Sequence, residues 1–172
     1  IKADRKGPIG YVPIMTGCDN FCSYCAVPYT RGRERSRKPE EIIKEVTNLV
    51  DSGFKEIWLL GQNVNSYNKG ESPNFSELLR MVNDINGDFW IRFTSSHPKD
   101  FNLKLIKAVQ ECKKVTNYLN LPIQSGDDQV LKAMNRPYTV KRYKEIISQV
   151  RKEIPNITIS TDIIVGFPGE TK

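Results

Sequence analysis

Residues Pro39–Gly61 read PEEIIKEVTNLVDSGFKEIWLLG, and this stretch holds the unit from which the fold is built. Pro39 predicts the start of a helix, because proline is tolerated in the first helical turn and two glutamates follow it. The next apolar residues recur at helical spacing, and Gly53 stands where a helix ends. Ile57–Leu60 is a short apolar run that predicts a buried strand. A helix that leads into a buried strand is half of a βαβ unit.

The same unit recurs along the chain. Helical patterns separate five apolar runs that predict strands: Ile9–Met15, Ile57–Leu60, Phe89–Phe93, Tyr118–Ile123 and Ile157–Val165. Strands that alternate with helices predict a parallel sheet with right-handed crossovers. We therefore expect an α/β fold, either an open doubly wound sheet or part of a (β/α) barrel. A complete eight-stranded barrel needs about 250 residues, so a barrel of this length would be partial.

Composition limits the class of protein. The chain has 172 residues, of which 38% are hydrophobic and 27% charged, and this excludes both a disordered tail and a membrane protein. We expect one domain over residues 1–172. The net charge of +6 favours a polyanionic partner such as RNA. The chain begins at Ile1 and nothing near it resembles a signal peptide, so we expect an internal piece of a longer cytosolic protein.

Unusual polar segments follow each of the five expected strands. They are Thr16–Cys25, Gly61–Asn65, Thr94–Pro98, Gln124–Asp127 and Gly166–Glu170. Both architectures place functional sites at the carboxyl ends of the strands. We therefore expect these segments to meet at one edge of the sheet.

Three of the four cysteines lie within eight residues, in the pattern Cys18-x3-Cys22-x2-Cys25. Clustered thiols favour a metal site over a disulfide framework. Three thiolates can hold three corners of an iron–sulfur cube and leave one iron open for chemistry. The alternative is a structural zinc with Cys112 as fourth ligand, although zinc sites commonly use paired C-x2-C units. We favour the cluster, and expect Cys112 to be a buried thiol that acts as a small apolar residue.

Two further features of the sequence could take part in binding: a row of arginines and the single histidine. Arg31, Arg33, Arg35 and Arg37 place a positive charge at every second position, so an extended backbone would put all four on one face. That face would suit RNA phosphates or a cofactor carboxylate, and the alternative is a solvated loop. The single histidine, His97, precedes a proline at a strand end. We expect it to form a hydrogen bond in the turn and not to bind metal.

The cysteine pattern, with Tyr24 before the last cysteine, resembles the signature of radical S-adenosylmethionine (SAM) enzymes. The sequence GCDNFCSYCAVPYTRGRERSR over residues 17–37 resembles the methylthiotransferase branch. Four later motifs resemble the same branch: LLGQNVNSY (59–67), RFTSSHP (92–98), LPIQSGD (121–127) and DIIVGFPGET (162–171). The match runs from about Gly10 to the end of the chain. PYTRG together with GQNVN most resembles the transferases that add a 2-methylthio group to an isopentenyl-type adenosine beside the tRNA anticodon.

This resemblance implies a partial barrel of six β/α units, of which five strands are present. It implies a 4Fe–4S cluster on Cys18, Cys22 and Cys25, whose free iron binds SAM. One electron would cleave SAM to a deoxyadenosyl radical, sulfur would enter the base, and a second SAM would supply the methyl group. A second cluster would lie in an amino-terminal domain and an RNA-binding barrel at the carboxyl end, both outside this chain. We therefore expect the piece alone not to transfer sulfur.

The resemblance also implies roles for residues along the sheet edge, although it assigns no catalytic side chain. Tyr24 would lie near the adenine or shield the cluster, with ordinary loop packing as the alternative. Gln62 and Asn63 would hold the cofactor's amino group, or stabilise a turn. Gln124 and Ser125 would contact the ribose hydroxyls, unless Ser125 only caps the next helix. Backbone groups near Asp162, Gly166 and Glu170 would contact the adenine, and Gly166 and Gly169 would let that backbone approach closely, with ordinary turn glycines as the alternative.

Three functions are compatible with the sequence. The first is the tRNA methylthiotransferase, with tRNA as substrate, an electron donor such as flavodoxin or ferredoxin, a sulfur source, no membrane partner and a cytoplasmic location. The second is a sibling enzyme that acts on threonylcarbamoyl-adenosine in tRNA or on a ribosomal-protein aspartate. The third is a zinc-stabilised RNA-binding module without catalysis.

Overall fold

The computed structural model describes residues 7–171. Its main strands are parallel and form two sheets: β1 (Ile9–Pro13), β4 (Glu56–Leu60) and β5 (Trp90–Phe93) in the order β1-β4-β5, and β6 (Tyr118–Asn120) with β7 (Thr158–Ser160). An isolated parallel bridge, Ile91 to Val115, joins the end of the first sheet to the segment that enters β6. The five predicted strands are therefore present, as three plus two and not as one continuous ladder.

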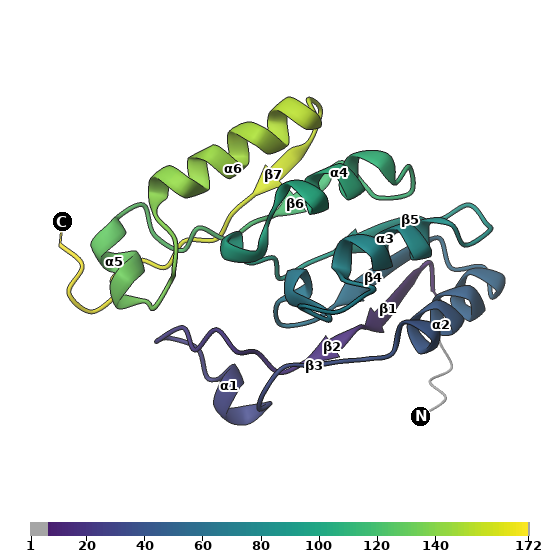
Figure 1. Ribbon diagram of the computed structural model, residues 1–172, viewed down its shortest axis with the longest axis horizontal. Coiled ribbons are helices and arrows are strands. Elements are labelled where there is room, and N and C mark those ends of the chain that lie inside the picture. Colours follow the sequence, from purple (N-terminus) through teal and green to yellow (C-terminus); the bar gives the residue numbers. More distant parts are fainter. Residues whose placement is uncertain (1–6, 172) are drawn as a thin grey trace.

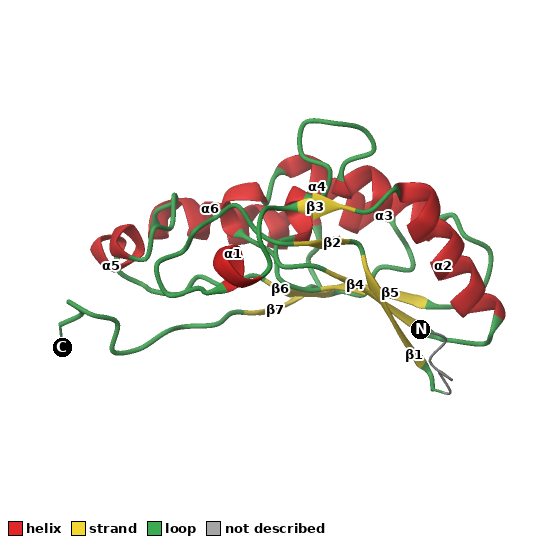
Figure 2. Cartoon of the chain, turned by 90° about the horizontal axis from the view of Figure 1, so that it is seen from below, coloured by secondary structure: helices red, strands yellow, loops and turns green. Residues whose placement is uncertain are grey.

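The helices lie on one side of these strands. Figure 2 shows α2 (Pro39–Asp51), α3 (Phe75–Asn83), α4 (Leu103–Glu111) and α6 (Val140–Glu153) in one layer above both sheets. The strand residues that face them are fully or nearly buried, among them Ile57, Leu59 and Ile91. Burying an aliphatic side chain of this size stabilises the fold by about 1.5–3 kcal/mol. A twisted parallel sheet with helices on one face is a partial (β/α) barrel, as predicted, and not a doubly wound sheet.

Local sequence explains why these helices begin where they do. Helix α3 starts with a capping box, in which the Asn74 side chain accepts from the backbone N–H of Glu77 and Glu77 accepts from the N–H of Asn74. Asn102 caps α4 and Thr139 caps α6 through their side-chain oxygens. The short helix α5 (Asp128–Ala133) is capped by Asp127. Ser125 is therefore not the cap, because it lies two residues before the N-cap position and its hydroxyl accepts from the N–H of Asp127 instead.

The last strand is shorter than predicted. We expected a strand over Ile157–Val165, but β7 ends at Ser160 and only one further parallel bridge, Gln124 to Ile163, follows it. Pro122 has no N–H to donate to a ladder, and Gln124 has a left-handed backbone (φ 72°) that no continuous strand adopts. These two residues interrupt the partner strand, so β7 cannot extend.

Five short elements complete the fold. They are β2 (Met15–Thr16), α1 (Val27–Thr30), β3 (Arg35–Ser36) and the 3-10 helices η1 (Val64–Ser66) and η2 (Pro98–Asp100). Strands β2 and β3 pair antiparallel and enclose the loop that carries the clustered cysteines. In Figure 1 this loop and α1 lie below α5, on the side toward which the carboxyl ends of the strands point. No helix among residues 7–171 has both the length and the hydropathy to cross a membrane.

Candidate metal and cofactor site

The cysteine loop leaves the β2–β3 ladder through Gly17. Its backbone is left-handed (φ 78°), and a Cβ at this position would lie 2.1 Å from the carbonyl oxygen of Arg33. The backbone N–H of Cys18 then donates to the carbonyl of Gly32 over 3.2 Å. Only glycine fits this close crossing of two chain segments. The crossing fixes the point from which the three thiols project.

All three clustered thiols are free. Cys18 and Cys22 are buried and Cys25 is half-buried. Nδ2 of Asn20 donates to Sγ of Cys18 over 3.4 Å, and Nη1 of Arg136 donates to Sγ of Cys22 over the same distance. Burial raises the pKa of the Cys18 thiol above its usual value, and the donation from Asn20 partly opposes that rise. Two of the thiols therefore already have N–H donors that would stabilise a negatively charged sulfur.

A segment from the opposite end of the chain holds this loop in place. The backbone N–H of Ser23 donates to the carbonyl of Met134 over 3.1 Å, and the Ser23 hydroxyl donates to the carbonyl of Ala133 over 2.9 Å. Nδ2 of Asn135, whose backbone is left-handed, donates to the carbonyl of Phe21 over 2.9 Å. Nδ2 of Asn135 also donates to the carbonyl of Asn20 over 3.3 Å. With the contact of Arg136, the end of α5 and the turn after it therefore hold the cysteine loop through five polar contacts. The sequence analysis missed this turn, and no local pattern indicates it.

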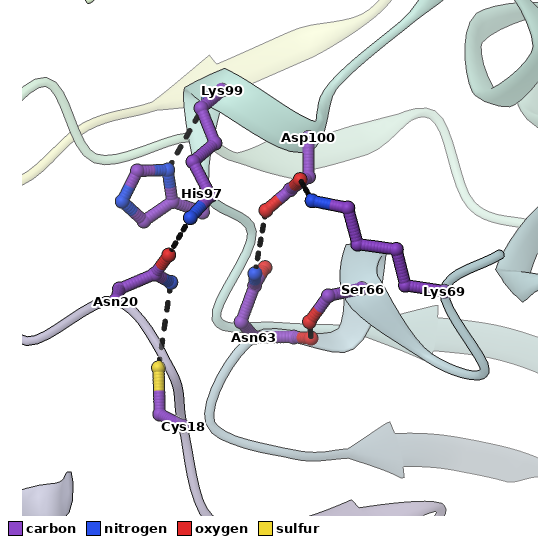
Figure 3. Close-up of polar contacts among 8 residues, drawn as sticks. All are labelled: Cys18, Asn20, Asn63, Ser66, Lys69, His97, Lys99 and Asp100. Atoms are coloured by element: carbon purple, nitrogen blue, oxygen red, sulfur yellow. Dashed lines mark hydrogen bonds and ion pairs between the residues drawn. The ribbon is translucent and has the colours of Figure 1, made fainter. Parts of the chain in front are cut away.

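The loops after β4 and β5 form a polar network beside the cysteines (Figure 3). Nδ2 of Asn63 donates to Oδ2 of Asp100 over 2.8 Å, and Nζ of Lys69 lies 2.8 Å from Oδ1 of Asp100. Lys99 contacts Oδ1 of Asn20, the same residue that donates to Cys18. The network therefore links the cysteine loop to both neighbouring strand ends. Of its members, only Asn63 was predicted as a site residue.

Several buried polar atoms at these strand ends make no hydrogen bond within the described part of the chain. They are Oε1 of Gln62, Oδ1 of Asn63, both amide atoms of Asn65, Oγ of Ser96 and Nε2 of His97. A buried polar atom without a partner costs about 1–3 kcal/mol, so a group of them at one edge indicates a polar ligand or water. Gln62 and Asn63 were predicted here, whereas Asn65 and Ser96 were not.

His97 forms the turn hydrogen bond that the sequence predicted. Its Nδ1 accepts from the backbone N–H of Lys99 over 3.2 Å, which leaves the proton of the neutral ring on Nε2. Burial lowers the pKa of His97 to about 2, and the nearby positive charges of Arg136, Lys99 and Lys69 lower it further. His97 is therefore neutral near pH 7, and its buried Nε2–H has no hydrogen-bond partner among residues 7–171.

The residues expected to contact the ribose and adenine differ in whether their polar atoms already have hydrogen-bond partners. Ser125 is buried and its oxygen already accepts from Asp127, and Oδ2 of Asp162 accepts from Asn120 over 3.2 Å. The backbone of Gln124 pairs with that of Asp162. Gly166 has a left-handed backbone (φ 71°), and its N–H donates to the carboxylate of Glu170 over 2.6 Å. Glu170 thus closes its own turn, while Gln124 and Asp162 do lie on adjacent segments.

Tyr24 lies against the cysteines. Its side chain is 38% exposed, and its phenol interacts with the thiol of Cys22. Burial raises the pKa of Tyr24, so the phenol keeps its proton. The position suits a residue that shields the thiols from solvent.

The four arginines do not form one row. The backbone of Arg31 is helical and Gly32 is left-handed, so the segment is not extended throughout. Arg33 pairs with Asp19 at 3.3 Å and lies over the Phe21 ring, and Arg37 pairs with Glu45 at 2.8 Å. The prediction of a single face therefore fails, because Gly32 turns the chain. Arg31 and Arg35 remain exposed.

Cys112 belongs to the core, as predicted. It is 3% exposed among apolar neighbours, and burial raises its pKa to about 11. It follows the last residue of α4, and a helix that crosses back between parallel strands ends at the amino-terminal edge of the sheet. Cys112 is therefore at the edge opposite the cysteine loop and cannot be a fourth ligand there.

The donor set fits an iron–sulfur cluster. Within residues 7–171, no three His, Cys, Asp or Glu side chains form a group that could hold one metal ion. In a four-iron cube each thiolate binds its own iron atom, so the three sulfurs stand further apart than ligands of a single ion do. Three free thiols on one loop, two of them with N–H donors, are ligands of the kind that such a cluster takes. The unpartnered atoms of Gln62 and Asn63 fit a polar cofactor bound beside it.

The chain is similar to known proteins over its whole length. Residues 12–172 match the Radical SAM superfamily. The chain is 57% identical over 175 aligned positions to the tRNA-2-methylthio-N(6)-dimethylallyladenosine synthase of Clostridium beijerinckii, and 53% identical to that of Clostridium botulinum strain Eklund 17B. Each alignment covers 100% of the chain and 38% of the relative. The chain therefore spans less than half the length of these curated relatives.

Solved structures of low sequence identity share the fold. The radical SAM methyltransferase TsrM of Kitasatospora setae, with cobalamin and a 4Fe–4S cluster bound, superposes with a TM-score of 0.74 at 18% identity, over 95% of this chain and 32% of that one. Methylornithine synthase (PylB) superposes with a TM-score of 0.59 at 19% identity, over 92% of this chain and 44% of that one. These likenesses confirm the partial barrel.

The superfamily match covers nearly all of the described residues. It includes the cysteine loop, the ends of β4 and β5 beside it and the turn after α5. Such enzymes take a 4Fe–4S cluster and SAM as cofactors. The three free thiols fit the cluster, and the buried polar atoms without partners at the strand ends fit SAM. The chain belongs to the radical SAM superfamily.

Proposed function

We propose that this chain is the radical SAM domain of a tRNA methylthiotransferase, which adds a methylthio group to carbon 2 of an isopentenyl-type adenosine beside the anticodon. The supporting observation is 57% identity over the whole chain to a relative named for that reaction on tRNA, together with three free thiols on one loop. When bound, the cluster and SAM supply the radical chemistry that inserts sulfur into an unactivated carbon.

The chain's own residues have separable parts in this proposal. Cys18, Cys22 and Cys25 hold the cluster, and Asn20 orients Cys18 through its N–H donor. Gln62 and Asn63 present buried acceptor oxygens to the amino group of SAM, since both atoms lack another partner. Asp100 fixes the Asn63 amide through its other end, so that only the oxygen is left to face the ligand.

A second group of residues is proposed for the nucleoside end of SAM and for the substrate. Tyr24 shields the cluster. The ribose and adenine of SAM are bound by Gln124, Ser125, Asp162 and Gly166. The exposed Arg31 and Arg35 bind tRNA phosphates, and Arg33 and Arg37 support them from within ion pairs. Because the proposed substrate is tRNA, we propose a cytoplasmic enzyme that takes electrons from flavodoxin or ferredoxin and sulfur from a separate donor.

The domain organisation is proposed from the same relatives. The chain covers 38% of their length, which leaves room for a second cluster domain and for an RNA-binding domain. We propose that residues 1–172 form one domain of that larger protein, and that this piece alone does not transfer sulfur. Methylthiolation of tRNA by the isolated piece would contradict this part of the proposal.

Deletion of the gene tests the proposed substrate. We expect nucleoside mass spectrometry of total tRNA to show loss of the 2-methylthio group from isopentenyl-type adenosine, while the unthiolated nucleoside accumulates. Wild-type gene and Cys112→Ala should restore it, and Cys22→Ala should not. Cys112→Ala is the matched control because it removes an identical thiol outside the site. Unchanged tRNA, or loss only from threonylcarbamoyl-adenosine, would contradict the assignment.

Anaerobic reconstitution of the full-length gene product tests the cofactor. We expect equal amounts of iron and sulfide and SAM-dependent release of 5′-deoxyadenosine. Cys22→Ala should lose the iron and sulfide of this site and the release of 5′-deoxyadenosine, whereas Cys112→Ala should behave as wild type. A protein that binds zinc in place of iron, with no cleavage of SAM, would support the RNA-binding module instead.

A further inference from the structure

A buried guanidinium points at one of the three clustered thiols. Arg136 is 7% exposed, and its Nη1 lies 3.4 Å from Sγ of Cys22, a residue 114 positions earlier in the chain. We propose that Arg136 is a positioning residue that orients Cys22 and raises the reduction potential of the cluster. This inference rests on the proposed cluster at Cys18, Cys22 and Cys25, and deepens it.

The guanidinium is held rigidly by the rest of its environment. Nε of Arg136 donates to the hydroxyl of Tyr138 over 2.7 Å, and Nη2 donates to the carbonyl of Pro122 over 3.3 Å. The Tyr138 hydroxyl donates in turn to the carbonyl of Ile123 over 2.9 Å, and its ring centroid lies 5.0 Å from the guanidinium carbon. Each of the three guanidinium nitrogens therefore donates one hydrogen bond, and the bonds of Nε and Nη2 fix the direction in which Nη1 points toward Cys22.

The charge of Arg136 has no carboxylate to balance it. Among residues 7–171 no Asp or Glu forms an ion pair with Arg136, and the nearby His97 ring is neutral. A buried cation is costly unless an anion compensates it. Three cysteine thiolates on an iron–sulfur cluster would provide that anionic partner. The unbalanced charge thus suggests a role toward the cluster beyond packing.

A fixed positive charge and a hydrogen bond to a ligand sulfur act in the same direction on redox chemistry. Both stabilise the reduced cluster, which carries one more negative charge, more than they stabilise the oxidised cluster. The midpoint potential therefore rises, and a cellular electron donor can reduce the cluster more easily. The segment just before Arg136 also binds the cysteine loop through two hydrogen bonds of Ser23, the residue next to Cys22, and these bonds hold Arg136 and Cys22 in a fixed relative position.

The test compares variants of the reconstituted full-length gene product by redox titration monitored with electron paramagnetic resonance. Arg136→Gln removes the charge and should shift the midpoint potential of this cluster to a more negative value at unchanged iron content. Arg136→Lys should restore part of the shift. Arg142→Gln is the matched control, since it removes an equal charge from an exposed helix position, and should titrate as wild type. An unchanged potential in a fully loaded Arg136→Gln protein would overturn the proposal.

A measurement on the wild type covers the case in which Arg136→Gln does not fold. Protein labelled with 15N-arginine should show a nitrogen hyperfine coupling to the reduced cluster, and Arg136→Lys should lack it. Absence of the coupling in the wild type would overturn the contact. A wild-type protein that binds no cluster would refute the proposed function instead, so the two failures can be told apart.

Discussion

Nδ2 of Asn63 donates to Oδ2 of Asp100 over 2.8 Å, and this bond joins the loop after β4 to the loop after β5. Asn63 is 1% exposed and Oδ1 of its amide has no partner in the described residues. Asp100 also pairs with Lys69, so one carboxylate fixes two segments at the edge where the cysteines lie. The bond determines which end of the Asn63 amide faces the site.

Asp100→Asn should weaken this edge. The substitution keeps the shape of the side chain and removes the charge that both donors bind. We expect the free energy of unfolding to fall by about 1–2 kcal/mol, most of it from the buried bond to Asn63, because Lys69 is well exposed and its pairing is screened. Urea unfolding measures the change. Asp88→Asn, at a fully exposed carboxylate, should change the stability by less than about 0.5 kcal/mol; an equal loss in both would contradict the assigned role.

Gly17→Ala should disrupt the cysteine loop. The Cβ of an alanine there would overlap the carbonyl of Arg33, and the alanine itself would have to adopt a left-handed backbone. We expect a loss of more than about 2 kcal/mol in the free energy of unfolding, together with reduced iron content after reconstitution. Gly126→Ala is the control, because its Cβ would meet no atom within 4 Å. Full iron loading by Gly17→Ala would show that the close crossing does not position the thiols.

His97 should make the stability depend on pH. Burial lowers its pKa to about 2, whereas the ordinary value is 6.5, so between these values the unfolded chain binds a proton that the folded chain does not. Stability from this group is complete above pH 6.5 and falls as the pH falls, by about 2 kcal/mol between pH 7 and pH 5.

His97→Asn removes this titration and keeps an acceptor for the N–H of Lys99. Urea unfolding at several pH values should therefore give a smaller loss of stability toward pH 5 in the variant than in the wild type. Identical pH dependence in the two proteins would show that His97 is protonated in the folded state.

Cys112 should resist alkylation in metal-free protein. Its pKa of about 11 leaves a very small thiolate fraction at pH 8, and its sulfur is buried. We expect iodoacetamide to label Cys112 more than about 100-fold more slowly in the folded protein than in urea. Peptide mass spectrometry follows each cysteine separately, and half-buried Cys25 is the internal reference. Equally fast labelling of both residues in folded protein would contradict the core position of Cys112.

Much of the fold could be predicted from local patterns. Helical and strand periodicities located the five parallel strands and the helices between them, because each pattern reflects which side of an element is buried. The burial of Cys112 and the turn bond of His97 followed from the same reasoning. The length of β7 and the course of the arginine segment did not, because Gln124 and Gly32 adopt left-handed backbones that depend on neighbouring segments.

The candidate site also contains residues that the sequence predicted and residues that only the structure shows. The spacing of Cys18, Cys22 and Cys25 predicted a metal-binding loop, and strand order predicted the sheet edge at which Gln62 and Asn63 would join it. Arg136, Asp100 and Ser96 carry no such signal, since an arginine in a turn or an aspartate in a 3-10 helix is ordinary by itself. Their importance lies in contacts with residues that are distant in the sequence.

By itself, the amino-acid sequence determined the β/α order, the sheet edge at which the loops meet and the three thiols on one of them. These properties depend on neighbouring residues and on the regular geometry of helices and strands. Only the tertiary structure decided that a buried arginine points at Cys22 and that Asp100 orients Asn63. Such contacts arise when packing brings together segments that are up to 114 residues apart, and the burial that gives them their energy exists only once the chain has folded.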